Sequence, residues 1–115
     1  MAFDAQYIHG DATMGDYTPG SAVAAGSVIV LGAAGWAIGI AHQDIPANTP
    51  GSIAVGFGVY KMKGAAALAQ GAKVYWDAVA HNLTATSAGN TLFGYLVTAC
   101  SGAGAYCEAL HNAFI

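Results

Sequence analysis

Short apolar runs separated by turn residues recur along the whole chain. The runs are rich in β-branched and aromatic residues, and Gly, Pro, Asn and Asp stand between them. This pattern is typical of an all-β domain rather than of alternating strands and helices. We predict strands at residues 5–8, 27–31, 36–41, 53–62, 73–77, 83–86, 91–99 and 105–110. The predicted fold is therefore all-β, a small single-domain β-barrel or sandwich-like fold.

The clearest alternation lies in IAVGFGVYKM, residues 53–62. One face carries the large apolar residues Ile53, Val55, Phe57 and Val59, and we predict that it is a core face. The other face is nearly devoid of side chains and carries Ala54, Gly56, Gly58 and Tyr60. Because Gly inside a strand marks a bulge or a close approach of another segment, we expect something to pack flat against this second face.

One segment has a helical composition. Residues 65–70 are Ala, Leu and Gln, which are good helix formers, but Gly64 and Gly71 bracket them. A segment of under two turns is too short to be helical alone in water, so we predict one short docked helix near residues 65–70. From Lys73 the β pattern returns.

The composition limits the possible partners. The 115 residues form one domain, with 56% hydrophobic and only 8% charged residues, whereas soluble chains carry about 25% charged residues. This charge is too sparse to cover a free monomer. There is no Arg, and the Lys residues are Lys61, Lys63 and Lys73, so we predict neither nucleic-acid binding nor a basic membrane surface.

Residues 20–41 form an uncharged run long enough to span a bilayer. The run follows Pro19, is interrupted by four Gly residues and has no flanking Lys or Arg, so we predict that it does not cross a membrane. The N-terminus also lacks the basic start and apolar stretch of a signal peptide. In a reducing compartment, Cys100 and Cys107 are then predicted to be two small, partly buried thiols, although a hairpin of suitable register would allow a bridge.

No catalytic constellation is found in the sequence. Two His-x-Asp pairs occur, His9 with Asp11 and His42 with Asp44. Neither has a third ligand at a recognisable spacing, so solvated turn residues are favoured over a metal site. His81 and His111 are expected to be exposed. We therefore predict no enzyme activity, no metal and no cofactor.

The aromatic residues fall into two groups. Four are predicted to lie in the core: Trp36, Phe57, Trp76 and Phe93. The six Tyr residues remain open, because Tyr is amphipathic and is enriched at protein contacts.

Three stretches give the chain a family resemblance: GDATMGDYTPGSAVAAGSVIVLG (10–32), QDIPANTPGSIAVGFGVYKMKGAAALAQGAKVYWD (43–77) and LTATSAGNTLFGYLVTACSGAG (83–104). With them the chain resembles the small phage and prophage proteins grouped as domain of unknown function DUF2190, regarded as capsid decoration or cement proteins. The end, AYCEALHNAFI, departs from the Val/Arg-alternating strand that often closes these proteins.

The resemblance implies a structural protein on the exterior of a phage head. It implies trimers at threefold or quasi-threefold positions, where the chain stabilises contacts between capsomers of the major capsid protein. The implied partners are the major capsid protein and further copies of the chain, and the implied location is the virion, after synthesis in the host cytoplasm. The alternative is a head-displayed adhesin or glycan-binding module, in which Trp36, Trp76 or the Tyr residues form a stacking platform.

Residues 1–20 carry apolar anchors separated by polar residues and Gly. We interpret them as a possible extended arm that adds a strand to the capsid protein, with residues 21–115 as the decoration domain. An edge strand of the chain's own sheet has the same pattern and stays open as the alternative. The residues expected at a capsid or subunit interface are Phe3, Tyr7, Ile8, Tyr17, Tyr60 and Phe114.

Overall fold

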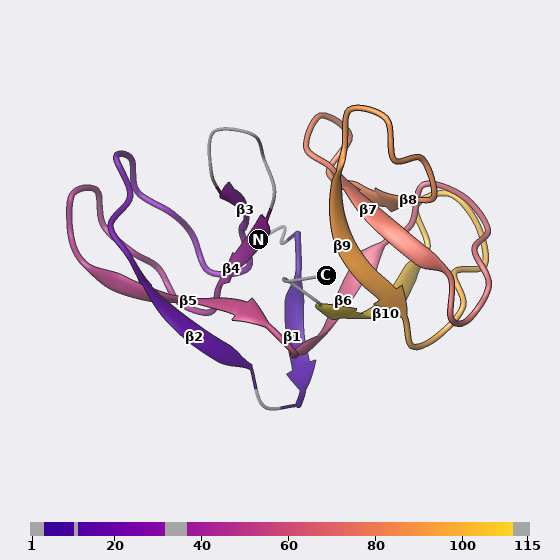
Figure 1. The fold of residues 1–115 in the computed structure, drawn as a ribbon, viewed down its shortest axis with the longest axis horizontal. Coiled ribbons are helices and arrows are strands. Elements are labelled where there is room, and N and C mark those ends of the chain that lie inside the picture. Colours follow the sequence, from indigo (N-terminus) through magenta and orange to yellow (C-terminus); the bar gives the residue numbers. More distant parts are fainter. Residues whose placement is uncertain (1–3, 11, 32–36, 112–115) are drawn as a thin grey trace.

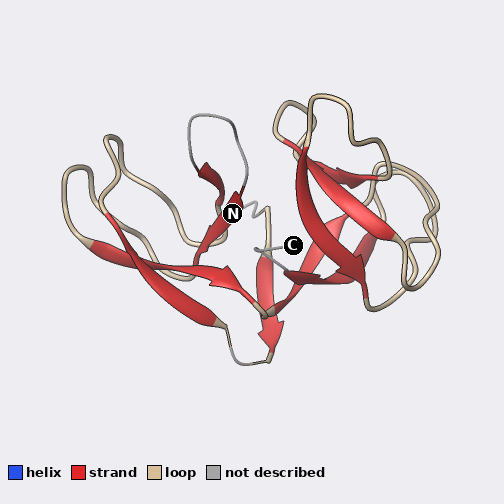
Figure 2. Ribbon diagram, viewed as in Figure 1, coloured by secondary structure: helices blue, strands red, loops and turns tan. Residues whose placement is uncertain are grey.

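The fold is known from a computed structural model, which describes residues 4–10, 12–31 and 37–111. The described residues form β-strands and turns without a helix (Figures 1 and 2). The strands are β1 (Gln6–His9), β2 (Thr13–Tyr17), β3 (Val28–Leu31), β4 (Ala37–Ala41), β5 (Gly51–Gly56), β6 (Val59–Lys63), β7 (Lys73–Asp77), β8 (Asn82–Thr84), β9 (Thr91–Leu96) and β10 (Tyr106–His111). The all-β prediction is confirmed.

The strands make two antiparallel sheets. The first has six strands in the order β1-β6-β10-β9-β7-β8, and the second has four in the order β2-β5-β4-β3. The chain changes sheet between β1 and β2, and again between β5 and β6. Figure 1 shows the two sheets as two lobes, with these changes of sheet close together at the lower end of the view.

The strand predicted at 53–62 is two strands, and Phe57 lies at the break. Phe57 has a φ of 73° and its N–H donates to the carbonyl oxygen of His111, 2.5 Å away. The break resets the alternation, so Tyr60 becomes fully buried whereas Phe57 is 56% exposed. The prediction that Phe57 belongs to a core face is therefore wrong, because strict alternation assumes a strand that stays in one sheet.

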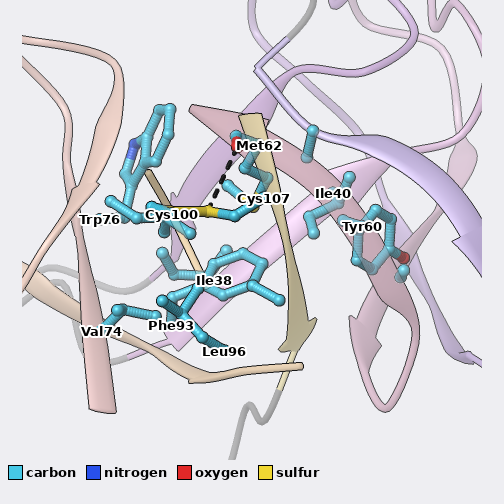
Figure 3. Close-up of a cluster of buried hydrophobic side chains, with 14 residues drawn as sticks. Ile38, Ile40, Tyr60, Met62, Val74, Trp76, Phe93, Leu96, Cys100 and Cys107 are labelled. Atoms are coloured by element: carbon cyan, nitrogen blue, oxygen red, sulfur yellow. Dashed lines mark hydrogen bonds between the residues drawn. A yellow bond between two sulfur atoms is a disulfide. The ribbon is translucent and has the colours of Figure 1, made fainter. Parts of the chain in front are cut away.

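The main core joins the two sheets. Ile38 and Ile40 of the four-stranded sheet pack with side chains of the six-stranded sheet, among them Met62, Trp76 and Phe93 (Figure 3). The core placement predicted for Trp76 and Phe93 is confirmed, and Trp36 lies outside the described residues. A second cluster covers the four-stranded sheet and contains Ala41, Ile45 and Ile53, with Tyr17, Val23, Ile29, Leu31 and Val55 packed against it.

Residues 65–70 form turns and isolated bridges instead of the predicted helix. The Ala65 N–H donates to the Leu83 carbonyl oxygen (2.7 Å), and Leu68 exchanges two main-chain hydrogen bonds with Cys100 (2.9 and 3.0 Å). The helix prediction was wrong because a segment this short gains too few internal hydrogen bonds to offset helix nucleation. Pairing with distant strands supplies those bonds instead.

Cys100 and Cys107 form a disulfide, which corrects the prediction of two free thiols. Cys100 follows β9 and Cys107 lies in β10, so the β9–β10 hairpin places their Cα atoms 5.0 Å apart. The prediction of free thiols assumed a reducing compartment. In the structure the register of the hairpin brings the two Cys residues face to face, which is the geometric condition for a disulfide. Both residues are buried and belong to the main core (Figure 3).

The uncharged run at 20–41 contains β3 and β4, with residues 32–36 outside the described part. None of the described residues belongs to a helix of the length and hydrophobicity needed to cross a membrane.

Gly58 gives a test of the change of sheet. A Cβ atom there would lie 2.8 to 3.0 Å from three atoms of the Tyr60 ring. Because an aromatic ring cannot shift one atom at a time, Gly58→Ala is expected to displace the ring and lower the free energy of unfolding by about 1–3 kcal/mol. Chemical denaturation measures the loss. Gly102→Ala is the control, since a Cβ there meets nothing within 4 Å. An equal effect of both substitutions would contradict the close packing of the Tyr60 ring against Gly58.

Candidate interaction surfaces

His111 ties the two sheets together. Its side chain is 0% exposed, although the sequence predicted exposure near the C-terminus. Its Nε2 donates to the carbonyl oxygen of Ile38 in β4 (2.7 Å), and its N–H donates to the Gly58 carbonyl oxygen (2.8 Å). The exposure prediction was wrong because β10 extends to His111 and carries it between the sheets.

Burial keeps the His111 imidazole neutral. Desolvation lowers its pKa from 6.5 to about 4, with a further lowering by His42, against an opposing effect of the hydrogen bond to Ile38. Nδ1 has no hydrogen-bond partner in the described part of the chain. A proton on Nδ1 would therefore place an unpartnered charge in the core.

A second polar cluster lies beside it. His42 Nε2 and the Tyr60 hydroxyl share a hydrogen bond of 2.6 Å, and the Tyr7 ring lies 4.8 Å from the His42 ring. Burial lowers the pKa of His42, while burial, with a smaller effect of Tyr7, raises the pKa of Tyr60 well above its usual range. Tyr7 and His42 also line a cleft of about 200 Å³. This is smaller than the pockets of about 300 Å³ or more that hold small-molecule ligands.

His42 and Asp44 do not act as a unit. Asp44 accepts the Ala25 N–H (2.8 Å), whereas His42 bonds to Tyr60, and Asp11 lies outside the described residues. His81 is exposed in a turn, as predicted, and its Nδ1 lies 3.0 Å from a carboxylate oxygen of Asp4. Within the described ranges, no three His, Cys, Asp or Glu side chains come together as a metal site.

The opening segment contributes an edge strand to each sheet. β1 pairs with β6, with Tyr7 opposite Tyr60, and β2 pairs with β5, with Met14 opposite Ala54. The sequence predicted a strand near β1 but missed β2. In this structure residues 6–9 and 13–17 pair within the chain's own sheets, and the interpretation of residues 1–20 as an arm stays a prediction. An additional contact of the segment with a capsid stays a prediction.

Exposed apolar residues lie on the segments that meet where the chain changes sheet. Four of them are at least one third exposed, and we refer to them as the junction residues: Tyr7 (44%), Ile8 (37%), Met14 (45%) and Phe57 (56%). The end of β1, the start of β2 and the β5–β6 connection meet at the same end of the molecule (Figure 1). Large apolar side chains left in water mark contact surfaces when they cluster. The sequence did not identify Met14 as a surface residue, and it placed Phe57 in the core.

Phe57 is the most unusual of the junction residues. A bulky residue with a φ of 73° is a conformational outlier. At a positive φ the Cβ atom comes too close to the backbone carbonyl oxygen, so any residue other than Gly is strained there. Strained positions of this kind cluster at binding and switch sites. An exposed aromatic ring held in a strained backbone therefore points to a function for the ring.

The other residues expected at an interface are distributed differently. Tyr17 is partly buried against the second core cluster. Tyr60 has no exposed surface and is therefore not part of the interface proposed below. Phe3 and Phe114 lie outside the described residues. Trp76, a possible stacking platform of an adhesin, is only 2% exposed.

The family of the chain follows from a comparison with protein-family models. The model described as phage cement protein matches residues 8–111. The chain belongs to the phage cement protein family. No curated protein and no solved structure shows a significant match. The matched segment begins within β1 and ends at the last residue of β10, so it contains nearly all of both sheets. A cement protein has a structural role in stabilising a phage capsid, which agrees with the resemblance found in the sequence.

Proposed function

We propose that this chain binds the exterior of a phage head as trimers and stabilises contacts between capsomers of the major capsid protein. The observation that carries the proposal is the cement-family match over residues 8–111. The sparse charge supports it, because a chain with only 8% charged residues suits a protein whose surface is largely covered by neighbours. In this role the chain has no catalytic function.

The junction residues are the proposed capsid contact. Phe57 is the most exposed of them, at 56%, and edge strand β1 carries Tyr7 and Ile8. An edge strand has unpaired main-chain groups that can pair with a strand of another protein, while exposed apolar side chains supply affinity. A strained Phe57 is then retained for binding rather than for stability.

Phe57→Asn separates these two effects. Asn tolerates a positive φ far better than Phe, so the melting temperature is expected to be unchanged or higher. Loss of a central aromatic contact is expected to weaken binding to heads at least about tenfold. Cosedimentation with purified heads that lack the chain measures binding, and differential scanning calorimetry measures stability.

Val79→Asn is the matched control, because Val79 is 94% exposed in the turn between β7 and β8. Full head binding by the Phe57→Asn chain would contradict the proposed contact. A wild-type chain that binds no heads, and does not raise the temperature at which they release DNA, would contradict the proposed function itself.

A further inference from the structure

The Cys100–Cys107 disulfide ties the connection between β9 and β10 to strand β10 itself. We call residues 97–105 the β9–β10 connection. The chain has two Cys residues, and they are 3% and 4% exposed. In the sheet register Cys107 is opposite Met62, near the end of β6, whereas Phe57 lies just before the start of β6. The length of β6 therefore separates the disulfide from the proposed capsid contact.

A segment with few buried side chains lies against this connection. Residues 64–72, which we call the β6–β7 segment, have mostly exposed side chains. Leu68 and Ala72 are partly buried against the main core. Burial of apolar surface therefore contributes little to holding the β6–β7 segment in place, and its hydrogen bonds to other parts of the chain have to do so.

Main-chain hydrogen bonds join the β6–β7 segment to the β9–β10 connection. Leu68 exchanges two of them with Cys100 (2.9 and 3.0 Å). The Gly64 N–H donates to the Ala105 carbonyl oxygen, and the Gly64 carbonyl oxygen accepts the Gly104 N–H, both at 2.9 Å. A Cβ atom on Gly64 would lie 2.7 Å from Cys100 Sγ, so the bare Gly64 backbone packs directly on the disulfide. The position of the β6–β7 segment therefore depends on the position of Cys100.

The fold also accommodates the two Cys residues as thiols. The Sγ atom of Cys107 lies 3.6 Å from the Met62 carbonyl oxygen, which accepts the S–H of the reduced residue (Figure 3). Strand β10 pairs with β6 and β9 through main-chain groups, and this pairing does not need the disulfide. Cys100, in contrast, lies beyond the end of β9 and pairs only with the β6–β7 segment among the described residues. Reduction therefore frees the connection and leaves the strands paired.

We propose that the Cys100–Cys107 disulfide is a redox-operated clamp on the β6–β7 segment. In the disulfide state the β9–β10 connection holds this segment against the six-stranded sheet. In the dithiol state the segment and the connection open together as one local unit, while both sheets persist. Because both sulfur atoms are buried, a reagent reaches them only after this local opening.

Closure of the clamp is a thiol–disulfide exchange with a small-molecule disulfide such as oxidised glutathione. The thiolate of one Cys attacks the glutathione disulfide, which breaks its S–S bond and releases one glutathione. The thiolate of the other Cys then displaces the second glutathione from the mixed disulfide. The two Cys residues lose two electrons and two protons, and two reduced glutathione molecules receive them.

The clamp responds to a change of surroundings that the proposed function implies, and this step rests on that function. A cement protein is made inside a cell, where thiols are kept reduced, and acts on a particle outside it, where disulfides persist. The chain then binds the head in the dithiol state, and the clamp closes on the bound chain after release.

Amide hydrogen exchange of the full chain, read by mass spectrometry, tests the clamp in oxidised glutathione and in dithiothreitol. Reduction is expected to raise the exchange rate of the β6–β7 segment and the β9–β10 connection at least about tenfold. Exchange in β1 to β5 is expected to stay unchanged. C100A/C107A is expected to exchange like the reduced wild type under both conditions, which excludes an effect of the reagents themselves.

Gly64→Ala tests the packing on the disulfide. Its Cβ atom would press on Cys100 Sγ, so reduction by dithiothreitol is expected to become at least about tenfold faster. Gly102→Ala is the control within the connection, because a Cβ there meets nothing within 4 Å, and it is expected to keep the wild-type rate. Equal reduction rates for the two variants would contradict the role of Gly64.

Three results overturn the clamp: unfolding of the whole chain on reduction, equal exchange in the two states, or Cys residues that remain thiols in oxidised glutathione. Heads decorated with the reduced chain and then treated with oxidised glutathione are expected to carry the disulfide. Thiols that persist there overturn closure on the head. Failure of the chain to bind heads in either state contradicts the proposed function alone, because the exchange measurement uses no heads.

Discussion

Acidification from pH 7 to pH 4 is expected to lower the free energy of unfolding by about 3 kcal/mol through His111 alone. In the folded chain burial lowers the pKa of His111 to about 4, against 6.5 for an unperturbed His. The unfolded chain therefore binds a proton first as the pH falls. The stabilising contribution is complete above pH 6.5 and is lost as the pH falls towards 4.

No group packed around His111 stabilises the positive charge that protonation of its imidazole would create. The Phe93 ring stacks on the imidazole at 5.2 Å, Tyr60 packs at 6.0 Å, and the Ile38 carbonyl oxygen is already bonded to Nε2. His42 adds repulsion, because it also gains charge when the pH is lowered. Urea unfolding at several pH values measures the loss.

His111→Gln isolates this effect. Gln keeps an N–H donor but does not titrate, so its stability is expected to vary less than that of the wild type between pH 6.5 and pH 4. Equal slopes for the wild type and His111→Gln would contradict the assignment of His111 as the acid-sensitive group.

Phe93→Ala is expected to lower the free energy of unfolding by about 3–5 kcal/mol. Phe93 is 0% exposed, stacks on His111 and makes an edge contact with Tyr60 at 6.5 Å. Its removal leaves a cavity between the two sheets that these rings cannot fill without losing their hydrogen bonds to Ile38 and His42.

Tyr95→Ala is the matched control for Phe93→Ala. Tyr95 is on the same strand, β9, but its ring is 37% exposed on the outer face of the sheet. A loss of about 1 kcal/mol or less is expected there. Chemical denaturation measures both variants, and similar losses would contradict a core that is organised around Phe93.

The sequence predicts most of the strands because local alternation and turn residues decide them. The segments around β3, β4, β7, β9 and β10 were predicted within a few residues. β2 was missed because Gly15 and Asp16, which are unfavourable in strands, interrupt TMGDY, and pairing with β5 holds it in the sheet. The helix predicted at 65–70 failed for a related reason, since tertiary pairing replaced local preference.

The interaction surfaces were only partly predictable. Tyr7 and Ile8 were identified as anchors by their alternation with polar residues. Phe57 was assigned to the core because the change of sheet at Gly58 is invisible to a period-two pattern, although the Gly residues around it were a signal. Which side chains share the outer face of the six-stranded sheet depends on the register between β6, β10, β9 and β7, which a single sequence does not specify.

The central claim, that the chain is a component of the phage capsid, is tested most directly by quantitative mass spectrometry of purified virions. The measured quantity is the copy number of this chain relative to the major capsid protein. A cement protein that covers the lattice is expected at a ratio close to one. Absence of the chain from purified virions would contradict the account.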